Sequence, residues 1–596
     1  MRVKEATEEV MIYGGLWLRV VKKAGQVKPT RARVAEVLHF ISRKGKMSKK
    51  PKYPVVSRRD FFKRGAVVGM GANTLAGQAR AQARSGQIKF DHVANVVVVG
   101  AGASGLPAAI MACDQGASVI VIDANRDIGG HAIVRGGRIP LGGGTRLQKK
   151  YGIADSADQV YLDHTNFKNS EFRFGDRELI RMWANENAAT FDFLLDNGVI
   201  FNDAPPTIVN GGSVPRLFVA KPYSDNLNET INGSPGSGLM RHLEASARKK
   251  GAAIFLRHKL TRILRENSKS GRVFGVTANL EGREVNIQAR RGVVIATGGH
   301  TANVDFRRMF DPRLTEEYQT AGEPWTRQEA DGELLAMDIG ASLWAASNTA
   351  NERGYTVTKT LHIGCRYGYR NLKWNPKSPV FERAGASGLT VADFRDVILV
   401  NRFGQRFWNE VDETYNFLNA ALSTQGDPNK DGKTNGGGPI WAIFDSGAVA
   451  REHWDPKPPN VDTNGWFFAA DSIAELASRI SNPYQYQPMA ASALAQTVVR
   501  YNSFVEADND ADFGKPAPRY KIEKPPFYAA WSTPILHDCL AGLRISTKCE
   551  VIDIHGKVIP GLYCAGESAG GFALHGLPRV IVFGRVAGRE AALAKV

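Results

Sequence analysis

The chain of 596 residues contains only five cysteines, and their spacing excludes several kinds of site. None of them forms a CxxC pair, so nothing supports a zinc ribbon, a thioredoxin-like redox site or covalent haem attachment. We therefore expect no metal site. An odd number also argues against a disulfide framework, so we expect mostly buried free thiols. The five are Cys113, Cys365, Cys539, Cys549 and Cys564.

Excess positive charge is scarce in most of the chain, although the net charge is +18. Residues 1–83 hold 19 Lys and Arg against 5 Asp and Glu, which gives +14 and leaves +4 for the other 513 residues. The larger part shows no basic stripe with interleaved aromatic residues, so its composition argues against nucleic-acid binding. Its length is enough for two or three domains with a large buried core.

Long apolar runs are scarce as well, and we expect no membrane span after residue 84. The apolar stretch at 65–79 is too short and too rich in glycine to cross a bilayer stably. It follows the segment SRRDFFKRG (57–65), and small-x-small cleavage sites follow it at 79–83. This order resembles a twin-arginine export signal over 47–84, with the twin-arginine translocase as partner and a periplasmic or exported product. The alternative is a basic amphipathic helix on the protein surface.

The start of the chain carries a second expectation. Signals of this type begin a few residues before the arginines, whereas 56 residues precede the segment SRRDFFKRG that contains Arg58 and Arg59. Met47 is followed by Ser, Lys and Lys, like a natural start. We therefore expect residues 1–46 to be an upstream extension that is absent from the working protein.

Glycine, by contrast, is abundant, and one cluster stands between two predicted strands. Four valines (96–99) predict a buried parallel strand, GAGASG follows at 100–105, and a helix is expected to run to about Asp114. A second strand (118–122) ends at Asp123. This arrangement predicts a dinucleotide-binding βαβ unit.

Each residue of this unit has a mechanical role. Gly100 permits a tight turn, Gly102 lets the backbone approach a pyrophosphate, and Gly105 allows close packing of helix on strand. The helix N-terminus favours phosphate, and Asp123 can accept hydrogen bonds from ribose hydroxyls. The candidate residues here are Gly100, Ala101, Gly102, Ala103, Ser104, Gly105, Asp123 and Ala124.

Three later segments favour a flavin over a nicotinamide. IGGH (128–131) and GGGT (142–145) follow the first unit, and a predicted strand ends in TGG (297–299). Near the C-terminus a strand at 562–565 ends in Gly566 and Glu567, and a helix begins near Pro578. The dipole of that helix would stabilise a reduced, anionic flavin.

Together these segments resemble the fumarate reductase/succinate dehydrogenase flavoprotein superfamily, which includes the 3-ketosteroid dehydrogenases. Further landmarks are EADGELLAMDIGA (329–341), VNRFGQRFWNE (400–410), HDCLAGLRIS (537–546) and GLYCAGESAGG (561–571). The resemblance implies an α/β fold: a Rossmann-type FAD-binding domain (85–345 and 526–596) with an inserted α+β capping domain (346–525). Hydride would pass between the flavin and a carbon next to a carbonyl or carboxylate.

The resemblance also implies which further residues contact FAD. In some members a histidine near the GG pair holds FAD covalently, but the spacing of His131 does not match, so we expect non-covalent binding. The candidates are Gly129, Gly130, His131, Gly143, Gly144, Leu260, Thr297, Gly298, Gly299, Asp331, Gly332, Gly566, Glu567, Arg579 and Val580.

Five residues are catalytic candidates by the same resemblance. His537 matches the first histidine of an HHTMGG-like stretch, whose second histidine is here Asp538. Arg451 lies near where fumarate reductases carry a proton-delivering arginine, and Tyr415 is a possible acid or base. His575 and Arg579 keep the HGxxR spacing of a carboxylate-gripping pair, with Arg579 alternatively placed at the flavin O2.

The departures argue against a true fumarate reductase. The segment 572–584 is several residues shorter than HGxxRxGGN and its helix start, the Glu-x-x-Arg relay after Glu410 is missing, and we expect no haem in this chain. We expect an FAD-dependent oxidoreductase of C–C bonds next to a carbonyl or carboxylate, with a small-molecule substrate. A quinone or cytochrome is the expected electron partner.

Two alternatives remain. One is a flavin oxidase, or a hydroxy-acid or amine dehydrogenase, on the same scaffold. The other is a non-enzymatic electron-transfer subunit, against which the capping domain argues.

Overall fold

The structure is a computed structural model that describes residues 88–166, 175–209, 212–226, 229–345, 355–370, 372–413, 415–423, 435, 437–572, 574 and 576–595. It also describes the backbone of an antiparallel pair, β1 (Val10–Tyr13) and β2 (Leu16–Arg19). The proposed export motif (57–65) lies outside the described residues. By its contacts the chain forms two units, Met1–Gly77 and Gln78–Val596, and everything below concerns the second.

An eight-stranded sheet forms the centre of the first part of this unit. Its order is β22 (Glu550–Ile552), β23 (Val558–Cys564), β10 (Arg283–Ile295), β3 (His92–Val99), β4 (Val119–Ile122) and β7 (Ala253–Phe255). The strands from β23 to β7 are parallel. The four consecutive valines of β3, Val96–Val99, are at most 3% exposed, as expected for a segment of strand covered on both faces. Antiparallel strands β8 (His258–Arg265) and β9 (Val273–Leu280) extend the sheet from β10.

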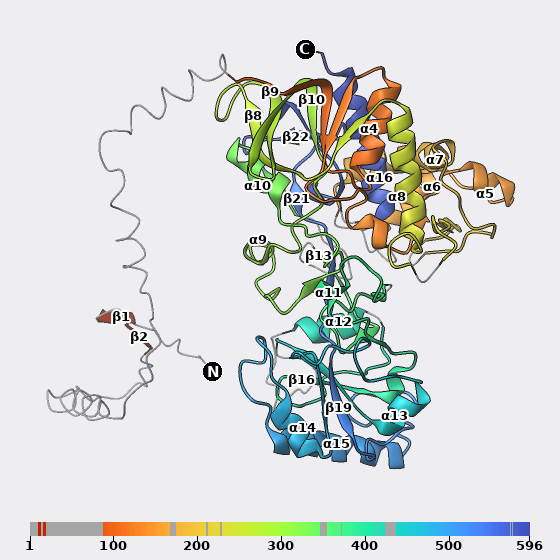
Figure 1. The fold of residues 1–596 in the computed structure, drawn as a ribbon, viewed down its shortest axis with the longest axis vertical. Helices are drawn as coiled ribbons and strands as arrows, with labels where there is room; N and C mark the ends of the chain where they lie inside the picture. The colour runs from red at the N-terminus through yellow and green to blue at the C-terminus, as the bar shows by residue number, and fades with distance from the viewer. Residues whose placement is uncertain are drawn as a thin grey trace, which may run out of the picture. The chain divides into compact units, whose positions relative to one another are not determined.

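Three helices pack side by side against this sheet (Figure 1). They are α4 (Gly105–Asp114), α8 (Pro235–Lys249) and α16 (Leu577–Leu593). Glycines of α16 make the contact with α4 close: a Cβ at Gly584 would lie 2.2 Å from the Ser104 carbonyl oxygen, and one at Gly588 2.1 Å from that of Ala108. Nearly all of α16 is therefore buried, and its N-terminus stays fixed beside the glycine turn after β3.

A second, four-stranded antiparallel sheet forms the other part of the unit. Its order is β16 (Ile398–Asn401), β17 (Ile440–Asp445), β19 (Phe527–Trp531) and β18 (Phe467–Ala470). The nearby helices are α12 (Tyr415–Leu422), α13 (Ser446–Arg451), α14 (Ile473–Arg479) and α15 (Ala491–Glu506). This sheet has its own apolar clusters. Because β19 belongs to it, the sheet runs past the expected boundary at residue 525.

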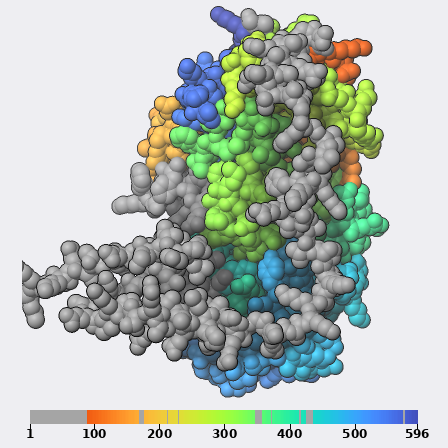
Figure 2. Space-filling model, turned by 90° about the vertical axis from the view of Figure 1, so that its left-hand side faces the viewer, coloured from red at the N-terminus to blue at the C-terminus, as the bar shows by residue number. Residues whose placement is uncertain are grey.

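A small sheet combines two strands that precede the four-stranded sheet in the chain with one strand that follows it. It joins β11 (Gln319–Thr320), β20 (Ile535–Cys539) and β13 (Tyr355–Thr358). In the space-filling view, the green surface around residues 300–340 lies next to the teal and blue surface of the segment with the four-stranded sheet (Figure 2).

The remaining elements lie outside these three sheets. They are η1 (Ala132–Val134), β5 (Arg138–Pro140), α5 (Arg146–Lys150), α6 (Ala157–Thr165), α7 (Arg177–Asp196), β6 (Leu217–Val219), α9 (Val304–Arg308), α10 (Asp331–Asp338), β12 (Leu343–Trp344), β14 (His362–Ile363), α11 (Phe381–Ala384), β15 (Leu389–Thr390), η2 (Phe394–Asp396), β21 (Gly542–Leu543) and η3 (Gly566–Ser568).

Two expectations about composition can be compared with the fold. All five cysteines are free thiols, of which Cys113 is half-buried and the other four are buried. In the part of the chain that the structure describes, no helix is both long enough and apolar enough to span a membrane.

Candidate functional site

A cleft opens where the parallel strands β3, β4 and β10 end at their carboxyl edge. It contains about 1010 Å³ of empty space, part of it open to solvent. Ligands of open parallel sheets bind at this edge. Its walls are residues Val99, Gly100, Gly102, Ala103, Ser104, Ile122, Asp123, Ala124, Asn125, Gly129, Gly130, His131, Ala132, Arg135, His258, Leu260, Ala296, Thr297, Gly298, Thr326, Arg327, Gln328, Asp331, Asp538, Glu567, Gly576, Leu577 and Val580.

The three glycines of the first turn occupy three different environments. Gly100 has φ +109°, and a Cβ there would lie 2.1 Å from the Ala296 carbonyl oxygen, so only glycine makes this turn. A Cβ at Gly105 would lie 1.7 Å from the Gly100 carbonyl oxygen and 3.3 Å from Val98 Cγ1. A Cβ at Gly102 would meet only the Gly129 carbonyl oxygen, at 4.0 Å. Gly100 and Gly105 thus shape the turn, whereas Gly102 leaves space in the cleft.

A second glycine pair faces this turn. Gly129 N donates to the Ala101 carbonyl oxygen at 2.8 Å, which holds the two segments together. A Cβ at Gly130 would meet only the Cα of Gly102, at 3.9 Å. The two segments therefore form a slot without side chains beside the N-terminus of α4. Such a slot, next to a positive helix end, suits a pyrophosphate.

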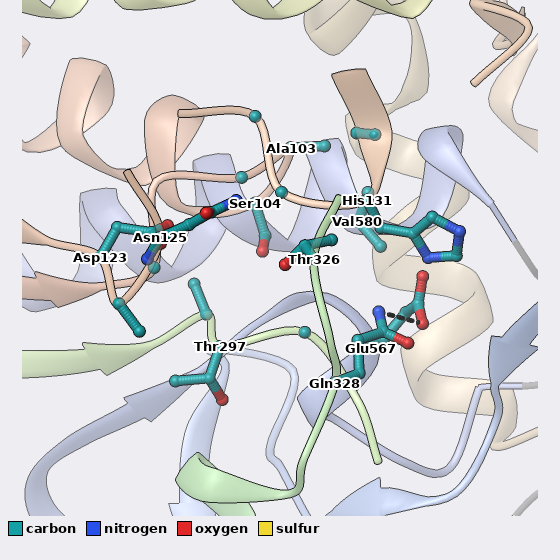
Figure 3. A pocket seen from close by; sticks show the side chains of 18 of the residues that line it. Ala103, Ser104, Asp123, Asn125, His131, Thr297, Thr326, Gln328, Glu567 and Val580 are labelled. Atoms are coloured by element: carbon teal, nitrogen blue, oxygen red, sulfur yellow. Dashed lines mark hydrogen bonds between the residues drawn. The ribbon is translucent and has the colours of Figure 1, made fainter. Parts of the chain in front are cut away.

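One end of the cleft is formed around Asp123 (Figure 3). Its carboxylate accepts hydrogen bonds from the backbone N–H groups of Ala101 and Asn125, both at 2.7 Å. Burial raises the pKa of Asp123, and these two hydrogen bonds oppose the shift. Leu260 lines the same region, and Asp331 there forms a 3.3 Å ion pair with Lys259.

The other end is formed around Glu567. Gln328 donates its amide to Glu567 at 2.9 Å, and the His131 ring points toward the same carboxyl group (Figure 3). Burial, followed by the Asp538 carboxylate, raises the pKa of Glu567 to about 8, whereas Arg135 and Arg579 oppose the shift.

His131 is neutral at this end of the cleft. Burial, followed by the charge of Arg135, lowers the pKa of His131 to about 3. Its Nε2 atom has no hydrogen-bond partner among the described residues. A buried ring nitrogen without a partner indicates that a ligand group completes its bonding here.

Arg135 connects this end of the cleft to strand β20. Its guanidinium donates to Asp538 at 3.1 Å and to the Tyr369 hydroxyl at 2.6 Å. The Tyr369 hydroxyl is also 3.1 Å from His537 Nε2, and His537 Nδ1 is 3.0 Å from the Thr358 hydroxyl. Asp538 is 1% exposed. The ion pair therefore gives a physical reason for an acid at the position where the resemblance has a second histidine.

Most residues expected to contact FAD lie in the cleft wall. Fifteen of them line it: Gly100, Gly102, Ala103, Ser104, Asp123, Ala124, Gly129, Gly130, His131, Leu260, Thr297, Gly298, Asp331, Glu567 and Val580. Others lie behind the wall, where they keep segments close: Ala101, Gly105, Gly299, Gly332 and Gly566. A Cβ at Gly332, for example, would lie 2.3 Å from Thr297 Oγ1.

Gly143 and Gly144 are not part of the cleft wall. Gly143 N donates to Asp155 at 2.6 Å and Gly144 N to Gln148 at 3.0 Å. These bonds belong to the turn that leads into the capped helix α5. The geometry gives both glycines a local structural role, and their assignment to FAD is not supported.

Arg579 points away from both positions expected for it. Its guanidinium donates to the carbonyl oxygens of Phe572, Leu574, Gly566 and Ala569 at 3.0–3.4 Å. It is 1% exposed. These bonds hold the backbone of 566–574 and give Arg579 a structural role.

Of the other catalytic candidates, His537 joins the Arg135 network and Arg451 does not. Arg451 forms a 2.5 Å ion pair with Asp396 and stacks on Tyr520 on the four-stranded part, outside the cleft wall. Its placement does not support a catalytic role. His575 and the side chain of Tyr415 lie outside the described parts of the structure.

Several wall residues were not found from the sequence, chiefly Arg135, Gln328, Asn125 and Thr326, together with Tyr369 behind the wall. Arg135 follows the IGGH motif by four positions, which is a usable signal. Gln328 and Tyr369 stand in no recognisable motif, so only the fold brings them to this cleft.

The fold and the cleft define a dinucleotide-binding α/β protein. The slot between the two glycine segments and the His131 nitrogen that no described residue binds both fit FAD. A model of the FAD binding domain family matches residues 95–578, so this chain belongs to that family and binds FAD.

Similar proteins cover almost the whole chain. The acrylate reductase flavoprotein subunit of Shewanella woodyi is 28% identical over 88% of this chain and 95% of its own length. The open conformation of a flavocytochrome c3 fumarate reductase superposes with a TM-score of 0.61 at 22% identity, over 88% of this chain and 81% of that one. The 3-ketosteroid-Δ4-(5α)-dehydrogenase from Rhodococcus jostii RHA1 gives 0.54 at 25%, over 85% and 98%.

Proposed function

We propose that this chain is an FAD-dependent oxidoreductase that adds or removes hydrogen across a C–C bond next to a carbonyl group. Membership of the FAD binding domain family and the similarity to reductases and dehydrogenases of such bonds support this function. We also propose that residues 85–345 and 526–596 hold FAD, and that residues 346–525 cover the substrate.

Within this function, we propose that ketones are better substrates than carboxylates. The observation that carries this preference is the position of Arg579, whose two terminal nitrogens donate to backbone carbonyl groups. Arg135 does line the cleft, but Asp538 balances its charge. A neutral carbonyl needs no such charge, only hydrogen-bond donors.

The chain's own residues would hold FAD along the whole cleft. Asp123 would accept hydrogen bonds from the ribose, and the slot between Gly102 and Gly130 would hold the pyrophosphate. Glu567 would accept a hydrogen bond from the ribitol. When bound, the flavin supplies or takes up the hydride. Cleft residues exclude water and orient the substrate.

The test is the anaerobic reoxidation of dithionite-reduced, FAD-loaded protein by a panel of unsaturated compounds. 2-Cyclohexen-1-one and 4-androstene-3,17-dione represent enones, and acrylate and fumarate represent carboxylates. We expect an enone to restore the flavin band near ~450 nm faster than either acid. Faster reaction with the acids contradicts the ketone preference but leaves the reaction type standing.

The same measurement separates the alternatives. Rapid reoxidation by oxygen, combined with bleaching by hydroxy acids or amines, indicates a flavin oxidase or an amine or hydroxy-acid dehydrogenase. A flavin that no organic compound oxidises or reduces indicates an electron-transfer subunit.

We further propose that the protein is exported through the twin-arginine pathway and exchanges electrons with a quinone or cytochrome. The support is the motif with Arg58 and Arg59, followed by an apolar stretch and small residues. N-terminal sequencing of the mature protein tests the export: a first residue near 82–84 is expected, and retention of Arg58 contradicts it.

A further inference from the structure

The Tyr369 hydroxyl lies between two groups that suit it to move a proton. Arg135 Nη1 is 2.6 Å from it and His537 Nε2 is 3.1 Å from it. A guanidinium has only donors, so the phenol oxygen accepts the first of these bonds, and its own hydrogen remains to be donated. The Tyr369 side chain is thus held at its oxygen from two sides.

The groups around the phenol are also placed to stabilise the phenolate that forms when Tyr369 loses its proton. A phenolate oxygen carries a negative charge, which the Arg135 guanidinium offsets directly. His537 is the neighbour that returns a proton, and Thr358 fixes the orientation of its ring from the other nitrogen at 3.0 Å. Asp538 in turn holds Arg135 at 3.1 Å.

The position of the phenol relates it to the cleft. Tyr369 is 3% exposed, and its partner Arg135 lines the cleft at the Glu567 end, where the flavin ring is expected. His537 lies on β20, two residues before Cys539, whose N–H is 3.4 Å from Glu567. The phenol oxygen thus lies directly behind Arg135 at this end of the cleft, next to the strand that carries His537 and Asp538.

We propose that Tyr369 is the acid/base residue of the reaction, with Arg135 and His537 as its positioning residues. This proposal rests on the proposed function. In the reducing direction, the Tyr369 O–H bond breaks and its proton forms a C–H bond at the carbon next to the carbonyl. The bonding pair of O–H stays on the phenolate oxygen. A reduced flavin, when bound, would supply the hydride for the other carbon, and the C=C π pair would form the new bond to the proton.

The experiment compares Tyr369→Phe with wild type in two reactions of the FAD-loaded protein. One is reoxidation of the reduced protein by 2-cyclohexen-1-one and 4-androstene-3,17-dione. The other is exchange of the α-hydrogens of cyclohexanone with D2O by the oxidised protein, followed by NMR, which needs a base but no hydride transfer. Tyr367→Phe, two positions away in the same loop, is the matched control.

We expect Tyr369→Phe to keep its FAD absorbance while both reactions slow by about 100-fold or more, the scale of general acid–base catalysis. Tyr367→Phe should stay within about threefold of wild type. If wild type reacts and Tyr369→Phe stays within about threefold of it, the role of Tyr369 is refuted while the proposed function stands. If neither an enone nor acrylate or fumarate reoxidises wild type and no exchange occurs, the proposed function fails and this proposal with it.

If Tyr369→Phe loses FAD or unfolds at a lower temperature than wild type, a second variant tests the proposal. Arg135→Lys keeps the cation but cannot bind Tyr369 and Asp538 together in the same geometry. It should slow α-hydrogen exchange by about tenfold or more while retaining FAD, and an unchanged exchange rate overturns the proposal.

Discussion

The contrast between Gly102 and Gly105 gives the sharpest test of how the cleft works. Both belong to the same turn, yet only Gly105 packs against the protein itself. An alanine Cβ at position 105 would lie 1.7 Å from the Gly100 carbonyl oxygen, whereas at position 102 its nearest neighbour would be 4.0 Å away. Gly102→Ala should therefore change the ligand site alone, and Gly105→Ala the fold as well.

The size of each effect follows from these distances. At position 102 the new methyl group occupies the slot meant for the pyrophosphate and pushes it from the backbone N–H groups. Losing one or two hydrogen bonds to a charged group, each about 1.5–3 kcal/mol, weakens FAD binding by about 10- to 10,000-fold. The free energy of unfolding of the FAD-free protein should change by less than about 0.5 kcal/mol. At position 105 overpacking should cost about 1–3 kcal/mol or more.

The assay needs two measurements on each FAD-free variant. Quenching of tryptophan fluorescence during an FAD titration gives the affinity, and thermal unfolding gives the stability. Gly116→Ala, where a Cβ would meet nothing within 4 Å, is the exposed control, although its positive φ makes it mildly strained. If the FAD affinity of Gly102→Ala is within about threefold of wild type, the pyrophosphate does not lie in this slot. If it melts as early as Gly105→Ala, the separation of ligand and fold is wrong.

Three further predictions concern buried charges. Buried arginine and lysine neighbours lower the pKa of Glu410 from 4.5 to about 2. The stabilising contribution of Glu410 is therefore complete above pH 4.5 and is lost as the pH falls toward 2. Glu410→Gln should flatten the acid branch of a plot of unfolding free energy against pH over this window, and an unchanged slope contradicts this. In urea unfolding, Asp538→His and Arg135→Ala should each cost about 3–5 kcal/mol and show a coupling of about 1–3 kcal/mol, whereas additive losses would mean that the pair does not interact. Arg579→Leu should lower both the melting temperature and the FAD content, and a variant that melts like wild type refutes the loop-holding role.

The site residues that could be predicted from the sequence are those whose conformation and position depend on residues close to them in the chain. Gly100 needs its positive φ because of the turn it makes, and Gly105 needs its missing side chain because a helix directly follows a strand. Asp123 stands at the end of the neighbouring parallel strand, so its position follows from sheet geometry. These constraints leave a pattern in contiguous residues, which any reader of the sequence can find.

Some of the predicted site residues lie outside the cleft wall because distant side chains bind them. Gly143 and Gly144 look like a ligand loop, but Asp155 and Gln148 bind their N–H groups and make them the start of a helix. Arg451 was placed by its distance from other landmarks, yet a carboxylate and an aromatic ring hold it outside the cleft. In neither case does the local sequence state which distant side chain satisfies the polar group.

The pairing of Arg135 with Asp538 shows why such partners escape a reading of one sequence. The two residues are 403 positions apart, and each looks like an isolated departure from a pattern. Burying either charge alone is costly, because an unpaired ion loses its hydration without a replacement. An acid in place of the second histidine is therefore stable only if the fold brings a cation to it. The same cation, Arg135, also binds Tyr369. The replacement of the second histidine by Asp538 therefore alters both the charge of the cleft and the group that moves the proton.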